Sequence, residues 1–145
     1  MTAADDRVDE LIEQFHLAQD EFVKGNPEPV EQLFSHREDV SLANPQGPAV
    51  RGWEQVAQTM ERAASQRRDG EATSFEIVAK YVTPELAYVV QVERFKARVG
   101  GREDTTPFTL RVTMIFRPED GAWKVVHRHA DPITTPQPAE SVIRE

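Results

Sequence analysis

Apolar residues recur at steps of three and four in the first part of the chain and at every second position in much of the rest. Residues 5–24 carry one apolar stripe with helical spacing, formed by Val8, Leu11, Ile12, Phe15, Ala18 and Phe22. Two further helices are predicted at residues 27–34 and 52–68, and a short strand at residues 39–44 lies between them. The first half of the chain is therefore expected to be mainly helical.

The second half is rich in Val, Ile, Thr, Tyr and Phe with period-two alternation, which is typical of β-strands. The segments between these runs contain Pro, Gly and Asp, the residues of hairpin connections. Four long strands in an antiparallel meander are predicted, at residues 73–82, 86–97, 108–116 and 123–129.

Helices followed by such a sheet indicate an α+β fold. We expect three N-terminal helices packed on a strongly curved antiparallel sheet, which forms a cone with an internal cavity at its open end. That cavity is the default ligand site. Residues 1–131 would make this single domain, and the proline-containing residues 132–145 would form an extended or mobile C-terminal tail.

The acidic balance of the chain changes which partners are expected. The 145 residues carry a net charge of −8, whereas nucleic acids and anionic membranes are bound by clustered lysines and arginines. The lack of cysteine excludes disulfides and thiolate ligands, and no cofactor is predicted. The first residues, MTAADDRVDELIEQF, do not have the basic and apolar pattern of a signal peptide, and no apolar run approaches a membrane span. A cytoplasmic location is therefore expected.

Two segments resemble a known family. The run DVSLANPQGPAVRGWEQV and the ending FRPEDGAWKVVHRHADP are similar to segments of the nuclear transport factor 2-like superfamily, which includes ketosteroid isomerase and the SnoaL-like proteins. The ending also resembles the association domain of calcium/calmodulin-dependent protein kinase II. The resemblance covers roughly residues 5–131 and implies a homodimer, formed through the sheet, and a pocket. It does not imply one function, because this fold hosts enzymes, binding proteins and oligomerisation modules.

The resemblance to ketosteroid isomerase can be tested at the positions that match its catalytic residues. The family's general base is a carboxylate just before the Pro-x-Gly turn, where this chain has Asn44, and an amide cannot accept and return a proton at neutral pH. Its two oxyanion donors, a tyrosine and a protonated aspartate, correspond to positions near Ala18 and Val112. All three roles are vacant, so isomerisation by that mechanism is not expected.

The ionisable residues of VVHRHADP allow several interpretations. His127, His129 and Asp131 share one side of an extended strand, but the outer two would be about 13 Å apart, too far for one ion. No metal site is predicted, and the histidines are expected beside a turn or at the dimer interface. The resemblance to the kinase association domain implies that Arg128 lines the pocket and binds an acidic ligand. Arg128 could instead neutralise a buried Glu93 on an adjacent strand.

One face of the strand at residues 86–97 should line the cavity, and the pattern does not say which. Gln91 and Glu93 share one face, opposite Tyr88 and Val90. If Glu93 faces the cavity, desolvation would raise its pKa and make it a candidate acid or base, with His129 as a second catalytic candidate. The predicted ligand contacts are Phe15, Gln19, Asn44, Met60, Gln91, Glu93, Met114 and Arg128.

Arg67 and Arg68 are predicted near the end of the third helix, where their charges complement the helix dipole and need no partner.

Three functions remain open. In the first hypothesis, the chain is a small-molecule-binding protein of the SnoaL-like kind without the isomerase catalytic set. Alternatively it is an acid–base enzyme, such as an isomerase, cyclase or hydrolase, acting on a small aromatic or polyketide-like substrate through Glu93 and a histidine. The third hypothesis is a dimerisation module with a vestigial cavity.

Overall fold

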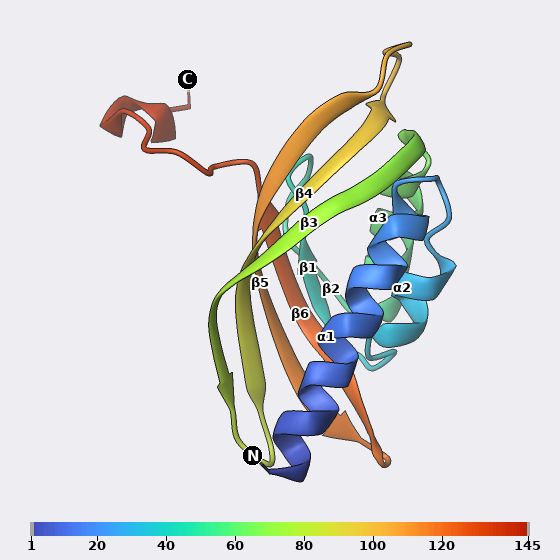
Figure 1. Cartoon of the computed structure of the whole chain (residues 1–145), viewed down its shortest axis with the longest axis vertical. Coiled ribbons are helices and arrows are strands. Elements are labelled where there is room, and N and C mark those ends of the chain that lie inside the picture. Colours follow the sequence, from blue (N-terminus) through green and yellow to red (C-terminus); the bar gives the residue numbers. More distant parts are fainter. Residues whose placement is uncertain (1, 145) are drawn as a thin grey trace.

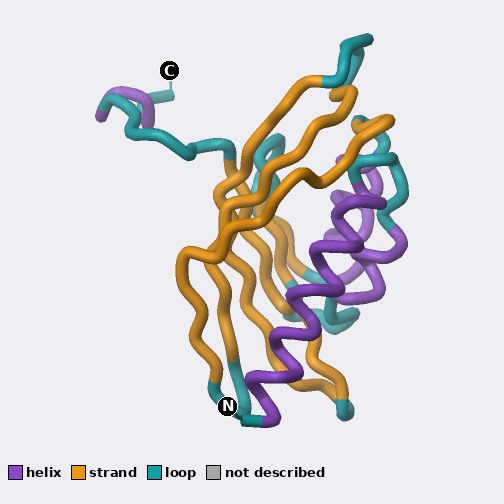
Figure 2. The backbone as a smooth tube through the Cα atoms, viewed as in Figure 1, coloured by secondary structure: helices purple, strands orange, loops and turns teal. Residues whose placement is uncertain are grey.

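Three α-helices lie together on one side of a six-stranded sheet, as the computed structural model shows for residues 2–144 (Figures 1 and 2). The helices are α1 (Ala3–Phe22), α2 (Glu28–Leu33) and α3 (Trp53–Ala64). The strands are β1 (Ser41–Ala43), β2 (Val50–Arg51), β3 (Arg67–Val82), β4 (Ala87–Val99), β5 (Thr106–Glu119) and β6 (Ala122–Asp131). The α+β class and the three predicted helices are confirmed, while β2 was not expected.

The sheet has the order β2-β1-β6-β5-β4-β3 and is mixed. Strands β3 to β6 form the predicted antiparallel meander. The prediction of a wholly antiparallel sheet was wrong, because β1 pairs parallel to β6, with Leu42 opposite Arg128. The hairpins of the meander leave one edge of β6 free, and β1 satisfies the backbone hydrogen-bonding groups of that edge.

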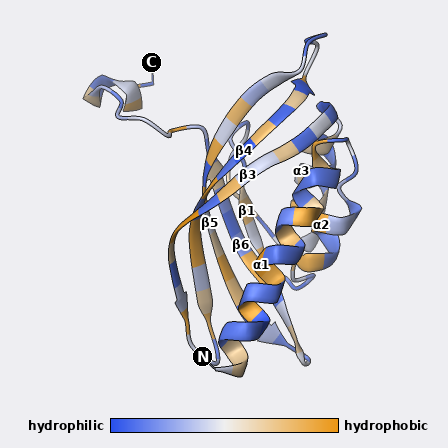
Figure 3. Ribbon diagram, viewed as in Figure 1, coloured by the Kyte–Doolittle hydropathy of each residue, from blue (hydrophilic) through white to orange (hydrophobic). Residues whose placement is uncertain are grey.

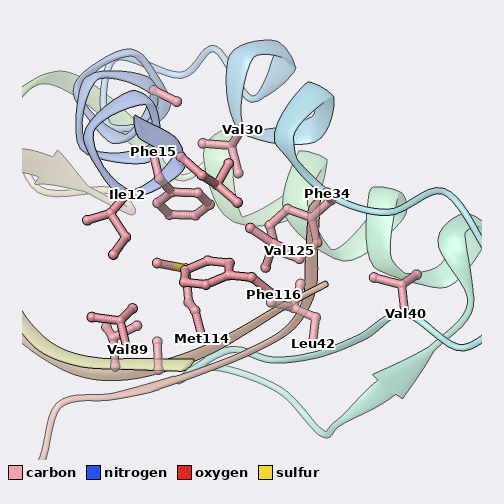
Figure 4. Close-up of a cluster of buried hydrophobic side chains, with 14 of the residues drawn as sticks. Ile12, Phe15, Val30, Phe34, Val40, Leu42, Val89, Met114, Phe116 and Val125 are labelled. Atoms are coloured by element: carbon pink, nitrogen blue, oxygen red, sulfur yellow. The ribbon is translucent and has the colours of Figure 1, made fainter. Parts of the chain in front are cut away.

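Helix α1 is stabilised by a capping box at its N-terminus and by an apolar stripe along one side. Thr2 and Asp5 make a reciprocal capping box, in which each side chain accepts a hydrogen bond from the other residue's backbone N–H. Five of the six residues of the predicted stripe are buried, from Val8 to Ala18, and Phe22 is partly buried. The stripe packs on the sheet and contributes to the main hydrophobic core together with Val89, Met114 and Phe116 (Figure 4).

Alternation along the strands sorts residues between the core and the opposite face, and apolar and polar bands follow one another along the ribbon (Figure 3). On β4, Val89, Gln91, Glu93 and Phe95 are buried, whereas Tyr88 and Arg94 are exposed. The side of β4 that carries Gln91 and Glu93 therefore faces the helices. Two polar side chains thus occupy positions that the pattern of a half-buried strand normally gives to apolar ones.

The boundary between α3 and β3 differs from the prediction. Helix α3 ends at Ala64, and Arg67 already begins β3, the first of the four long strands, six positions before the expected start. Gly70 lies against the end of α1, where its N–H donates to the carbonyl of Val23 at 3.1 Å. A Cβ at this glycine would lie 2.4 Å from that oxygen, so only glycine allows the strand to start so close to α1. The register also shifts between Arg68 and Glu71, which is a β-bulge.

The segment after β6 leaves the domain and ends in a short 3₁₀ turn, Ala139–Val142 (Figure 2). None of residues 132–144 is buried. The division into a domain of residues 1–131 and a tail stays a prediction. Within residues 2–144, no helix is long and apolar enough to cross a membrane.

Candidate functional site

Glu93 on β4 is paired with Arg128 on β6 in the interior of the fold. The Arg128 Nη2 donates to Glu93 Oε1 at 2.8 Å, and Nη1 donates to Oε2 at 3.0 Å. Glu93 is fully buried and Arg128 is 6% exposed. Of the two roles considered for Arg128, the structure shows neutralisation of Glu93. The sequence interpretation placed Glu93 and Arg128 on adjacent strands. In the structure β5 lies between β4 and β6.

The Glu93 carboxylate also accepts hydrogen bonds from two buried glutamines. Gln19 on α1 donates to Oε1 at 2.9 Å, and Gln91 donates to Oε2 at 2.7 Å. Burial opposes ionisation, but the Arg128 charge and the hydrogen bonds from Arg128, Gln91 and Gln19 outweigh it and hold the pKa of Glu93 below its ordinary value. The expectation of a raised pKa was wrong, because it took account of desolvation and not of these partners.

The ion pair is enclosed by further predicted residues. The Arg128 guanidinium lies 5.2 Å from the centre of the Phe15 ring, and its Nη1 is 3.6 Å from the sulfur of Met114. The Gln91 Oε1 is 3.0 Å from Nε2 of His16, whose ring stacks on Phe75. Four of the predicted ligand contacts are therefore packed in the interior and line neither of the two pockets that adjoin this network, namely Phe15, Gln91, Glu93 and Met114.

An inner pocket lies above this network, between α1, α3 and the sheet. Its wall includes Gln19, Asn44, Met60, Arg67, Phe95 and Arg128. Its volume is about 40 Å³, which is enough for a few water molecules. Four of the predicted ligand contacts, namely Gln19, Asn44, Met60 and Arg128, thus meet at one pocket.

An outer pocket of about 300 Å³ adjoins the inner pocket and reaches the surface beside α3. Its wall includes Thr59, Arg62, Gln66, Val99 and Gly100. The two pockets share Asn44, Gln46, Ala63 and Arg67. Of these two pockets, the outer one has the size of a small ligand site.

Arg67 lies at the boundary of the two pockets and was not predicted there. It is 8% exposed, its Nη1 donates to the carbonyl of Ala63 at 2.9 Å, and its guanidinium lies 5.9 Å from the centre of the Phe108 ring. Arg67 contacts the end of α3, as predicted, since Ala63 belongs to the last turn of that helix, but the helix stops at Ala64 and β3 carries the side chain inward to the pockets. An inward-facing arginine at the first position of a strand leaves no signal in the hydrophobic pattern.

The histidines of β6 belong to the opposite face of the sheet. His127 Nδ1 is hydrogen-bonded to the Ser41 hydroxyl at 2.7 Å, and His129 Nε2 lies 3.2 Å from Asp131 Oδ2. Burial lowers the pKa of His127, and the neighbouring His129 lowers it further. His129 is exposed and in register with Thr113, one position away from the inward-facing Val112, so Glu93 and His129 cannot serve one substrate. Within residues 2–144, no three His, Asp or Glu side chains are grouped to hold a metal ion.

The positions that match the isomerase oxyanion donors are both apolar and buried. Ala18 is 4% exposed on α1 and Val112 is fully buried on β5. Asn44 follows β1 and lines both pockets, in place of the family's general base. None of these three residues has an ionisable or phenolic side chain.

A comparison with protein families shows to which family the chain belongs. The model described as a SnoaL-like domain matches residues 8–134. The chain belongs to this family. No curated protein matches the sequence of this SnoaL-like chain.

Solved structures share the fold of this SnoaL-like chain. A nuclear transport factor 2-like superfamily protein from Salmonella enterica serovar Typhimurium is 21% identical, with a TM-score of 0.75 over 93% of this chain and 94% of that one. A ketosteroid isomerase-like protein from Erwinia carotovora atroseptica is 15% identical, with a TM-score of 0.76 over 93% and 100%. A candidate calcium/calmodulin-dependent protein kinase II association domain from Xanthomonas campestris is 18% identical, with a TM-score of 0.67 over 88% and 86%. At these identities the likeness concerns the fold alone.

Proposed function

We propose that this SnoaL-like chain is a small-molecule-binding protein whose ligand occupies the outer pocket and reaches the inner pocket, at the open end of a cone formed by the helices and the curved sheet. The observation that carries this proposal is the continuity of the two pockets through Asn44, Gln46, Ala63 and Arg67. A pocket with an apolar wall and a few convergent polar groups is the usual form of a ligand site.

The state of Glu93 supports binding over acid–base catalysis. Both carboxylate oxygens already accept hydrogen bonds from an arginine and a glutamine. A general base needs an available lone pair and a pKa near the operating pH, and the pKa of Glu93 is lowered instead. The outer pocket, at about 300 Å³, also argues against a purely vestigial cavity.

The outer face of the sheet supports a further proposal, that the chain forms a homodimer through this face. Tyr81 and Tyr88 are paired across β3 and β4, stack at 5.9 Å between ring centres and are 58% and 40% exposed. Val78 on β3 is also exposed. Neighbouring apolar side chains of this size on one surface are typical of an interface.

The binding proposal can be tested with small probes and a variant that fills the pocket. Benzamide, benzyl alcohol and benzoate, each at up to millimolar concentration, are titrated into the ¹⁵N-labelled protein and amide chemical shifts are followed. At least one probe should shift the amides of Asn44, Ala63 and Arg67. Ala63→Trp, which places an indole where the two pockets join, should remove these shifts.

Ala122→Trp is the matched control, because Ala122 is exposed at the start of β6 and lines neither pocket. It should bind the probes as the unmodified protein does. Absence of any shift around the pocket, or shifts that survive Ala63→Trp unchanged, would contradict the proposed function.

A further inference from the structure

The charge of Arg67 has no acidic partner among the described residues. Its side chain is found in no ion pair, and its second polar contact, from Nη2 to Gln46 Oε1, is long at 3.5 Å. Burial lowers the pKa of the guanidinium, and no carboxylate opposes this effect. An arginine remains charged under these conditions, so the boundary of the two pockets holds a largely buried positive charge that is stabilised only by neutral groups.

The pocket walls have the opposite electrostatic character to the chain. The chain carries a net charge of −8, yet the described residues that line the two pockets include Arg62, Arg67 and Arg128 and no Asp or Glu. Arg128 is neutralised by Glu93. Arg62 is exposed, so solvent screens its charge. Arg67 is thus the charge in the wall that is both desolvated and uncompensated.

We infer that the ligand is a small organic acid whose carboxylate binds Arg67, with its apolar body in the outer pocket. This inference rests on the proposed function and names the chemical class of its ligand. The planar guanidinium matches a carboxylate with two parallel hydrogen bonds. The inner pocket, at about 40 Å³, is too small for a ring, whereas the outer pocket, at about 300 Å³, has room for one.

The surroundings of Arg67 favour an organic acid over a bare inorganic anion. Phe108 lies beneath the guanidinium, and Met60, Phe95 and Leu110 line the adjoining wall. These side chains cannot donate hydrogen bonds to the remaining oxygens of a phosphate. The carbon skeleton of an acid lies instead in the outer pocket, where Ala63, Val99 and Gly100 form the apolar part of the wall.

The experiment compares benzoate with benzamide, a neutral probe of nearly the same shape. In titrations followed by amide shifts and by thermal unfolding, benzoate should bind the unmodified protein about tenfold more tightly than benzamide. Inorganic phosphate should bind more weakly than benzoate. Arg67→Met should lose the preference for benzoate, and Arg67→Lys should retain part of it.

Arg68→Met is the matched control, because Arg68 is the next residue along β3 and is exposed, outside both pockets. It should keep the full preference for benzoate. Arg67→Met should also unfold at the same temperature as the unmodified protein or higher without probe, since it removes an uncompensated buried charge. This keeps its folded state available for measurement.

The possible failures separate the two proposals. If benzamide and benzoate bind the pocket equally, the ligand class is wrong and the binding function stands. Phosphate binding as tight as benzoate would show a general anion site and contradict the organic acid. If the preference survives Arg67→Met, another residue recognises the carboxylate, and if no probe binds, both proposals fall.

Discussion

Arg128 and Glu93 lie on strands separated by β5 and still make two direct hydrogen bonds, at 2.8 and 3.0 Å. The long arginine side chain crosses above Met114 to reach the carboxylate. Because both groups are almost completely buried, each depends on the other for compensation of its charge. The pair is therefore a structural element of the core below the pocket.

Removing one member of this pair should destabilise the fold. Glu93→Gln leaves the buried Arg128 charge without its partner, and the free energy of unfolding should fall by about 3–5 kcal/mol. Urea denaturation measures this change. The double substitution Glu93→Leu with Arg128→Met should lower the free energy of unfolding by clearly less than the sum of the losses from Glu93→Leu alone and Arg128→Met alone, since no buried charge remains. Additive losses would show that the two residues are not coupled.

Stability should depend on pH near neutrality through Glu31 on α2. Burial, a hydrogen bond with Glu61 and the charge of Glu61 raise the pKa of Glu31 from 4.5 to about 7. A raised pKa in the folded state contributes stability that is fully present below the unfolded pKa of 4.5 and is lost as the pH rises through about 7. Thermal unfolding at pH 5.5 and pH 8 should therefore show lower stability at pH 8, by about 1 kcal/mol after solvent screening.

Glu61→Gln provides the control for this dependence. The amide removes the like charge, so the variant should be more stable than the unmodified protein at pH 8 and nearly equal to it at pH 5.5. The lowered pKa of Glu93 acts in a separate range, because its contribution is present above 4.5 and is lost as the pH falls through its folded pKa. An unchanged pH profile in Glu61→Gln would refute the role of this carboxylate pair.

Gly70→Ala should destabilise the protein strongly. Its Cβ would lie 2.4 Å from the Val23 carbonyl oxygen and 2.7 Å from the Val23 Cβ, so the end of α1 or the start of β3 must move, at about 3 kcal/mol. Gly101→Ala is the control, because no atom lies within 4 Å of its added Cβ. Denaturation midpoints of both variants measure the difference, and similar midpoints would contradict the close packing of this bulge.

Charge on the outer face of the sheet should disrupt the proposed homodimer. Tyr88→Lys places an ammonium group among exposed apolar side chains, where desolvation in an interface is unfavourable. Sedimentation equilibrium should show a dimer for the unmodified protein and a monomer for the variant. Leu17→Lys, at an exposed position of α1 that is 72% accessible, should remain dimeric. A monomeric unmodified protein at micromolar concentration would end the proposal.

The local order of elements follows from the sequence because it depends on neighbouring residues. The stripe from Val8 to Phe22 predicts α1, and the alternation in the second half predicts β3 to β6 with errors mainly at their ends. The turn residues between these strands specify an antiparallel meander. These features rest on periodicities of 3.6 and 2, which are properties of short segments.

The site depends on contacts that no local pattern contains. Whether Gln91 and Glu93 face solvent or the core could not be read from β4, since the donors that satisfy Glu93 come from Gln19 and Arg128, 74 and 35 positions away. The parallel pairing of β1 with β6 also joins distant segments. The inward position of Arg67 follows from the early end of α3 and the close approach of Gly70 to α1.

The sequence by itself thus determined the helices and the meander, because each is a matter of residue type and short-range spacing. The tertiary structure alone decided that Glu93 is a neutralised core residue and that Arg67 is an uncompensated charge in the pocket wall. The physical reason is that desolvation and Coulomb interactions depend on distances in space, which residues far apart in the chain establish only when the sheet and helices pack together.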